Sequence, residues 1–251
     1  MNQYKNLFEP IEINGLTWQK DSSWGNYYVT TLHAPSPNNL KNAITYSDNV
    51  YFARSALNIG KENLFKYYKN LKIGKKVPFE LALNKSQYIN KNQKVSDQLI
   101  ADSGYGQGQI LINPLQLASI YSSFINNGSI YRPHIVKKGE QMWIQRVFSD
   151  QTVKTIKEDL INVIADENGT GHSIYHENIQ LAGKTGTAEI KQSQSDTTGS
   201  ELGWFTVMTT DSKRPILMTT VVEDVKGRGG SGYVVEHTKT PLDSYFSKAN
   251  N

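Results

Sequence analysis

Two short runs of hydroxyl, amide and amine side chains are the residues whose types and spacing could do chemistry in this sequence. The first run is Ser47-Asp48-Asn49, and the second is Lys184-Thr185-Gly186-Thr187. The chain has no cysteine, which excludes a thiol nucleophile and leaves hydroxyl, carboxylate, imidazole or amine chemistry. Each run alone is a weak signal, because three-residue patterns occur by chance and a Lys-Thr-Gly often just ends a strand.

The first run is expected at a junction between two helices. An asparagine cap at 38–39 begins a helix with apolar residues at helical spacing, and a second helical run covers 50–57 before a stop at Gly60. The polar residues 47–49 therefore interrupt a helical pattern. A third helical pattern then continues to Gly74.

Two more helices are predicted in the middle of the chain. Asn113 and Pro114 supply a cap and a first-turn proline, and Asn127-Gly128 ends that helix. Its expected buried face consists of Leu117, Ala118, Tyr121, Phe124 and Ile125. The next helix begins at 149–150 and carries a regular apolar stripe to Ile164.

The second chemical run is expected on a strand. Residues 179–190, 202–210 and 215–225 read as strands joined by polar turns, and a weaker helix covers 231–246. Helices followed by an antiparallel meander indicate an α+β fold. We expect one domain, with a mainly helical lobe over 35–170 and a sheet with a C-terminal helix over 175–251.

Composition excludes several other classes of function. The 251 residues carry a net charge of only +4, and the lysine clusters at 61–76 and 85–94 read as ordinary solvated faces, so we expect no nucleic-acid partner. Metal and cofactor sites are not expected, because His172 and His176 lack an accompanying glutamate. The start at 1–6 has no apolar signal core, and no stretch approaches a membrane span.

The order of the two runs, together with three further stretches, resembles the transpeptidase domain of class B penicillin-binding proteins. Serine acyl-transferases that bind penicillin use S-x-x-K, then S-x-N, then K-T-G. The similarity is to the low-affinity, methicillin-resistance-type Gram-positive branch, which implies a role in antibiotic resistance. The stretches that carry it are 15–25 (GLTWQKDSSWG), 46–53 (YSDNVYFA), 101–108 (ADSGYGQG), 112–116 (INPLQ) and 182–189 (AGKTGTAE).

The resemblance implies a role for each residue of the two runs. In such a site a serine attacks the carbonyl of a D-alanyl-D-alanine stem peptide, and an oxyanion hole holds the tetrahedral intermediate. By analogy, Ser47 relays a proton to the leaving group, Asn49 binds the substrate's amide, and Lys184 supplies positive potential. By the same analogy, the Thr185 and Thr187 hydroxyls receive the substrate carboxylate, and the Thr187 N–H donates to the oxyanion. Gly186 leaves the strand edge open to the ligand.

The nucleophile of that family is missing from the sequence. No serine stands three residues before any lysine; the nearest patterns are Thr17 before Lys20 and Thr210 before Lys213. The family places S-x-x-K on a helix shortly upstream of the stretch that begins here at Gly15. We therefore expect the chain to be an N-terminally incomplete domain that lacks this helix and two preceding strands, and to be inactive alone.

The resemblance also implies ligands, partners and a location. Stem peptides and β-lactams would be the ligands, and divisome or elongation-type cell-wall proteins would be partners through the parent protein. The parent would act at the extracytoplasmic face of the plasma membrane. Two alternatives stay open, namely a β-lactam sensor domain and a non-catalytic remnant that retains a groove for stem peptides.

Overall fold

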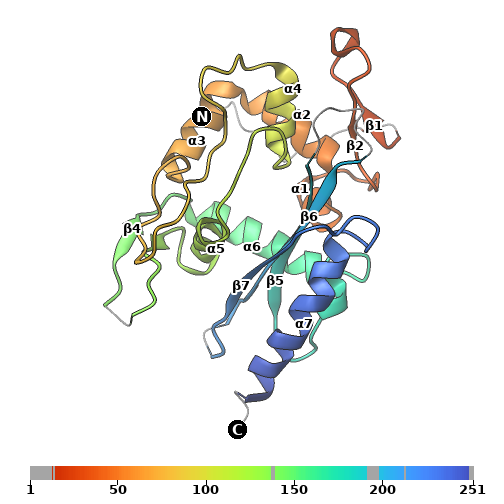
Figure 1. Cartoon of the computed structure of the whole chain (residues 1–251). Coiled ribbons are helices and arrows are strands. Elements are labelled where there is room, and N and C mark those ends of the chain that lie inside the picture. Colours follow the sequence, from red (N-terminus) through yellow and green to blue (C-terminus); the bar gives the residue numbers. More distant parts are fainter. Residues whose placement is uncertain (1–12, 14, 137–138, 191–197, 212, 249–251) are drawn as a thin grey trace.

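The computed structural model describes residues 13, 15–136, 139–190, 198–211 and 213–248 of the chain. The expectation of no signal core at 1–6 lies outside the described residues. Across these ranges, every helix is too short or too polar to cross a bilayer. Figure 1 shows the helices of residues 40–104 toward one end of the molecule, and the sheet with the C-terminal helix toward the other.

In the described part of the chain, six α-helices, three 3-10 turns and two small hairpins precede the sheet. Side chains cap the start of most of the α-helices. Asn39, Asp48, Ser96, Asn113 and Ser149 each accept a backbone N–H at a helix start. The α-helices are α1 (Leu40–Thr45), α2 (Asn49–Ile59), α3 (Lys61–Asn70), α4 (Asp97–Gly104), α5 (Pro114–Ser122) and α6 (Asp150–Ala165). The 3-10 turns are η2 (Ser22–Trp24), η3 (Ser123–Ile125) and η4 (His172–Ile174), and the hairpin strands are β1 (Thr17–Trp18) with β2 (Val29–Thr30) and β3 (Ile130–Tyr131) with β4 (Met142–Ile144).

A three-stranded antiparallel sheet forms the second half of the fold. Its strands are β5 (Leu181–Ile190), β6 (Ser200–Thr209) and β7 (Leu217–Val222), in that order, and α7 (Ser231–Lys248) follows them. The register pairs Lys184 with Thr206 and Thr187 with Gly203. The α+β architecture expected from the order of patterns is confirmed, and β5, which carries the Lys-Thr-Gly run, is an outer strand.

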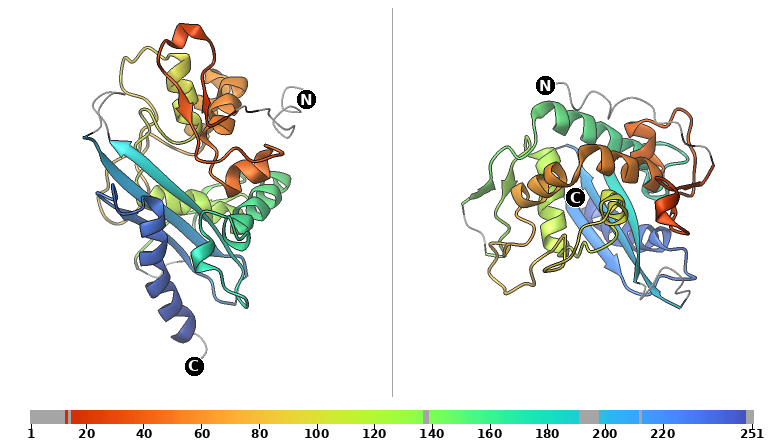
Figure 2. Two further views of the ribbon diagram at one scale, coloured as in Figure 1. Left: turned by 90° about the vertical axis from the view of Figure 1, so that its right-hand side faces the viewer. Right: turned by 90° about the horizontal axis from the view of Figure 1, so that it is seen from above.

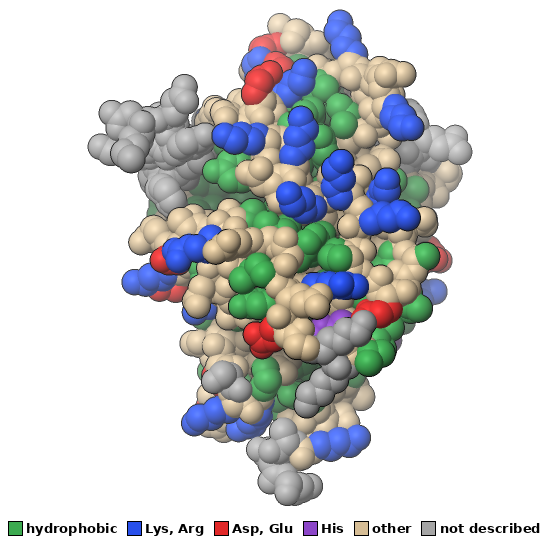
Figure 3. Space-filling model, turned by 90° about the vertical axis from the view of Figure 1, so that its left-hand side faces the viewer, with side chains coloured by type: hydrophobic (Ala, Val, Ile, Leu, Met, Phe, Trp, Pro, Cys, Tyr) green, Lys and Arg blue, Asp and Glu red, His purple; other side chains and the backbone are tan. Residues whose placement is uncertain are grey.

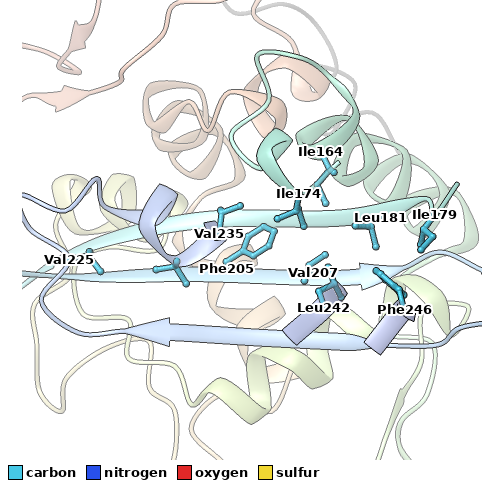
Figure 4. Close-up of a cluster of buried hydrophobic side chains, with 11 residues drawn as sticks. Ile164, Ile174, Ile179, Leu181, Phe205, Val207, Val225, Val235, Leu242 and Phe246 are labelled. Carbon is cyan, nitrogen blue, oxygen red and sulfur yellow. The ribbon is translucent and has the colours of Figure 1, made fainter. Parts of the chain in front are cut away.

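Helices cover both faces of this sheet, as Figure 2 shows. On one face, α7 buries Val234, Leu242 and Phe246 against Leu181 and Phe205 of the strands, and Figure 4 shows this cluster. On the other face, side chains of α1 and α6 pack against Ala182 of β5 and Met208 of β6. Because successive strand residues face opposite ways, even-numbered positions of β5 face α1 and α6, whereas odd-numbered positions face α7.

A second small core holds the β1–β2 hairpin against the helices. Trp24 is buried beside Val29, Val50 and Ala101, and Trp18 packs edge-on against it with ring centroids 5.5 Å apart. Trp24 therefore seals a core edge, which is a common role for aromatic side chains. The sequence patterns did not predict this hairpin or α4, because both are short and polar in composition.

The predicted buried face of α5 is wrong in part. Phe124 is buried, but Ile125 is exposed, and the most deeply buried positions are Gln116, Ser119 and Ser123. Their side chains donate to backbone carbonyls, as Gln116 does to Leu71 at 3.1 Å. Apolar spacing could not identify the face, because α5 lies between the sheet and other elements and is covered on more than one side.

Candidate active site

Ser47 lies at the bend between α1 and α2, in a backbone conformation that few side chains adopt. α1 ends at Thr45, Ser47 has a φ of +59°, and α2 begins at Asn49. The left-handed region costs a residue with a Cβ about 1 kcal/mol or more. The bend takes Ser47 out of both helices, which confirms the predicted helix junction. Its hydroxyl reaches Lys184 of β5.

The side chain of Asp48 fixes the position of this bend through two hydrogen bonds. Its side chain is fully buried; one oxygen accepts the Tyr51 N–H at 3.1 Å, and the other accepts the Asn38 side-chain amide at 2.7 Å. The carboxylate is therefore the N-cap of α2 and is joined at the same time to the segment that precedes α1. A buried carboxylate with its hydrogen bonds made is a rigid attachment, and it sets the position of the adjacent Ser47.

Lys184 meets the hydroxyl of Ser47 across the interface between β5 and the helix junction. Its Nζ atom donates to Ser47 Oγ at 2.7 Å and to the Thr185 carbonyl at 3.1 Å. Burial lowers the pKa of Lys184 to about 8, because desolvation disfavours the charged form. The amine thus titrates near neutral pH and is hydrogen-bonded to a hydroxyl, an arrangement that can pass a proton between the two groups.

The two threonines of the run lie on the opposite face of β5 from Lys184. Thr185 is buried and donates to the Thr170 hydroxyl at 2.7 Å. Thr187 is exposed, and its Oγ1 accepts the Ser231 N–H at 3.1 Å, which ties β5 to the start of α7. Both hydroxyls therefore have protein partners, and each keeps capacity for a further hydrogen bond.

Gly186 lies between these threonines on the outer strand. A Cβ placed there would come no closer than 3.6 Å to another atom, the Cβ of Trp204. The glycine is therefore not required by crowding within the fold. Its lack of a side chain leaves space on the surface of β5 next to Lys184.

Asn49, the last residue of the first run, makes its described side-chain hydrogen bond to the β1–β2 hairpin rather than to Lys184 or β5. Its side-chain amide donates to the carbonyl of Thr30 in β2 at 3.0 Å. This bond attaches α2 to the β1–β2 hairpin. Asn49 is thus the first residue of α2, and its side-chain nitrogen already donates a hydrogen bond within the protein.

Gln107 is a residue of the site that the sequence analysis did not select. It lies in the stretch 101–108 that carries the family resemblance, in a loop that follows α4 and reaches the sheet. The Gln107 side-chain amide donates to the carbonyl of Thr187 at 3.1 Å. Positive φ values at Gly106 and Gly108 bend the loop on both sides of Gln107, so the glycine spacing was the available signal.

A part-buried carboxylate holds this loop in place. Asp102 of α4 accepts the hydroxyls of Tyr27 and of Tyr105, the latter at 2.7 Å. Its backbone carbonyl also accepts the N–H of Gln107 at 2.9 Å. Burial raises the pKa of Asp102, and the two tyrosine hydroxyls oppose that rise. The loop, α4 and the β1–β2 hairpin are therefore connected at one carboxylate, close to the site.

The histidine pair noted in the sequence serves structural contacts. His172 Nδ1 is 2.9 Å from the carbonyl of Ile164, and His176 Nε2 is 2.9 Å from a carboxylate oxygen of Asp243. Among the residues that the structure describes, no group of three His, Cys, Asp or Glu side chains could hold a metal.

Comparison with known families gives a match over nearly the whole chain. The model of the penicillin binding protein transpeptidase domain matches residues 5–240. Penicillin-binding protein 3 of Bacillus subtilis is 40% identical over 240 residues, which are 94% of this chain and 36% of that protein. Peptidoglycan D,D-transpeptidase MrdA of Haemophilus influenzae is 25% identical over 239 residues, covering 83% of this chain and 36% of its own. The chain thus spans little more than a third of the length of these curated relatives.

Solved structures share the fold at low sequence identity. The transpeptidase domain of penicillin-binding protein 3 from Burkholderia pseudomallei superposes with a TM-score of 0.79 at 18% identity, over 98% of this chain and 73% of that one. The penicillin-binding protein PBP2 of Helicobacter pylori, solved in complex with MreC, has a TM-score of 0.70 at 24% identity, over 88% and 43%. At these identities the likeness concerns the fold.

Proposed function

This chain belongs to the penicillin-binding protein transpeptidase family, and from that premise we propose that its site takes part in acyl transfer from D-Ala-D-Ala stem peptides during peptidoglycan cross-linking. The observation that carries the proposal is the hydrogen bond between Lys184 Nζ and Ser47 Oγ at 2.7 Å. It joins the S-x-N and K-T-G runs beside the open surface of an outer strand. The family's acyl-transfer chemistry needs both runs at one place.

The proposed roles of Ser47, Lys184 and Asn49 combine their hydrogen bonds with the family resemblance, whereas those of the threonines rest on the resemblance alone. Ser47 and Lys184 form the proton relay toward the leaving group, and the lowered pKa of Lys184 keeps the amine close to exchange at neutral pH. Thr185 and Thr187 receive the stem-peptide carboxylate, and the Thr187 N–H contributes to the oxyanion hole. Gly186 leaves room for the ligand. Asn49 would bind the substrate's amide through its carbonyl oxygen, since its nitrogen donates to Thr30.

The 251 residues contain no S-x-x-K, and we propose that the chain as printed binds ligands without forming an acyl-enzyme. Losing one member of a serine catalytic unit typically costs about 10⁴ to 10⁶ in rate. A covalent intermediate requires a hydroxyl whose proton a base can remove. Ser47 instead accepts a hydrogen bond from the Lys184 amine. This proposal favours the second candidate function, a stem-peptide or β-lactam binding module.

Two measurements on the intact chain test these proposals together. Mass spectrometry after incubation with benzylpenicillin should show no mass increase, and NMR titration with a D-Ala-D-Ala peptide should shift resonances of Thr185, Gly186 and Thr187. A stoichiometric mass increase would contradict the proposed lack of acylation, and if it persisted without turnover it would support the sensor alternative. Shifts confined to surface residues far from β5 would contradict the site itself.

Three finer assignments rest on the relatives. The identity of 40% to a Bacillus subtilis penicillin-binding protein supports placement in the Gram-positive, methicillin-resistance-type branch. The complex of a Helicobacter pylori relative with MreC supports cell-wall proteins as partners of the parent. The same relatives support a location at the extracytoplasmic face of the plasma membrane. Absence of the parent protein from the membrane fraction of lysed cells would contradict that location.

A further inference from the structure

Positive charge is distributed unevenly along this chain. Residues 61–94 hold nine lysines, no arginine and only two acidic residues, Glu62 and Glu80. This segment therefore carries a net charge of +7 in a chain whose total is +4, and the remaining residues together carry −3. The nine residues are Lys61, Lys66, Lys69, Lys72, Lys75, Lys76, Lys85, Lys91 and Lys94.

Tertiary packing brings the two lysine clusters of this segment to one face. Tyr88, from the loop that carries the second cluster, packs against Phe65 and Tyr68 of α3, with ring centroids 5.0 and 5.2 Å apart. The loop therefore crosses the helix that carries the first cluster. Figure 3 looks onto the side of the molecule with α3, and Lys and Arg side chains gather over the upper part of that view. We call these nine lysines the basic face.

The charges of the basic face are exposed and uncompensated. All nine lysines are exposed, and none of them forms an ion pair with another described residue. Glu80, one of the two acidic residues of the segment, accepts the N–H of Ile135 instead. Like charges held together destabilise a folded protein unless counterions or a partner neutralise them.

We propose that the basic face binds a linear polymer of phosphate groups. Lysine is a compact point charge rather than a planar fork, so nine lysines without arginine suit repeated phosphates better than one planar carboxylate. Binding would release condensed counterions from the polymer and would weaken steeply with salt. α3 alone spans about 15 Å, a length that several consecutive phosphates can follow.

Two other polyanionic partners fit the basic face less well. An anionic membrane surface is bound more strongly where apolar side chains enter it, and only Tyr67 and Leu81 are large exposed apolar residues in the described segment 61–94. Single-stranded nucleic acid is held by aromatic rings that stack on bases. The rings of Phe65, Tyr68 and Tyr88 pack on one another and are partly buried, so they are not available for that role.

Binding of inorganic polyphosphate to the full chain tests the proposal. We expect saturable binding whose affinity falls with a log–log salt slope of about −3 or steeper, as four or more lysines neutralise phosphates. The triple variant Lys66→Gln, Lys69→Gln, Lys91→Gln should bind roughly tenfold more weakly and lose about two units of that slope. These side chains are exposed, and their removal relieves repulsion between like charges, so the melting temperature should stay the same or rise slightly.

A matched variant separates the basic face from net charge. Lys154→Gln, Lys213→Gln, Lys248→Gln removes the same three charges from exposed positions elsewhere, and it should keep the affinity within about twofold, because distant charges are screened beyond about 10 Å. Equal losses in both variants would overturn the proposal. So would binding to phosphatidylglycerol vesicles without binding to polyphosphate, or much tighter binding to an oligonucleotide of the same phosphate number.

Discussion

Lys184 Nζ lies 2.7 Å from Ser47 Oγ, and the two residues come from an outer strand and from a bend between helices. The bend depends on the left-handed backbone of Ser47 and on the buried Asp48 beneath it. The strand depends on packing of its even-numbered side chains against α1 and α6. The contact therefore depends on both halves of the fold at once.

Removing the buried amine should stabilise the protein. We expect Lys184→Met to raise the free energy of unfolding at pH 7 by about 2 kcal/mol, because it replaces a part-buried cation with an apolar chain of similar length. Chemical denaturation in urea measures the change. Lys154→Met on the exposed surface of α6 is the control, and an equal gain there would show that burial of Lys184 is not the cause.

This gain should vanish as pH rises. In the native protein the pKa of Lys184 is about 8, whereas its ordinary value is 10.5. Between these values the unfolded chain binds more protons than the native protein, so the stability of the unsubstituted protein increases with pH. The stability difference between it and Lys184→Met should therefore shrink from pH 8 to 10.5. A difference that stays constant over that range would contradict a lowered pKa for Lys184.

Two substitutions of Ser47 should distinguish the effect of its hydroxyl on Lys184 from the strain of its left-handed backbone. Ser47→Ala and Ser47→Gly both remove the acceptor for Lys184, and loss of a hydrogen bond to the charged amine should lower its pKa further below 8. NMR titration of the lysine side chain measures this. Glycine accepts a φ of +59° without strain, so Ser47→Gly should be more stable than Ser47→Ala by about 1 kcal/mol. The reverse order of stability would contradict strain at this bend.

Loss of the buried Asp48 carboxylate should lower the free energy of unfolding more than loss of an exposed side chain nearby. Asp48→Ala removes the cap of α2 and leaves the Asn38 amide without its partner, so we expect a loss of about 2–4 kcal/mol. Asp48→Asn keeps a cap acceptor, and Asn38 can turn its side chain to accept from the new amide, so it should lose less. Urea unfolding midpoints test both. Equal losses would mean that the negative charge, rather than the hydrogen bonds, stabilises the bend.

Substitution by alanine should destabilise the protein at one glycine of β5 and have little effect at another. A Cβ at Gly183 would come within 2.8 Å of the Thr206 carbonyl, whereas at Gly186 its closest contact is 3.6 Å. Gly183→Ala should therefore cost about 1–3 kcal/mol, while Gly186→Ala should fold normally. If ligands lie against β5, Gly186→Val should abolish stem-peptide binding in NMR titrations without lowering the melting temperature. Unchanged binding would place the ligand elsewhere.

The contact of Gln107 with the strand should hold its loop. Gln107→Ala removes the bond to the Thr187 carbonyl, and amide exchange of residues 105–108 should become faster. The stability of the whole domain should change by less than about 1 kcal/mol, because the bond is exposed. Gln109→Ala, in the same loop, removes the acceptor of the Asn90 N–H rather than a bond to the sheet and is the control. Identical exchange in both variants would show that the strand contact is not responsible.

Local features of this protein were determined by the sequence itself. The caps at Asn39, Asn113 and Ser149, the stop at Gly60, and the strand that carries Lys184 all follow from residues close together in the chain. Such features depend on short-range hydrogen bonds and on apolar periodicity, which are written in consecutive residues. The helix junction at 47–49 was predictable for the same reason.

Only the tertiary structure decided how these local pieces meet. The bond of Gln107 to Thr187, the opposite faces of Lys184 and Thr185, and the union of two lysine clusters around Tyr88 all join segments far apart in the chain. Composition carries no information about such distances, because they are set by which side chains share a core. The physical reason is that packing is cooperative: each contact forms only when the elements on both sides are already in place.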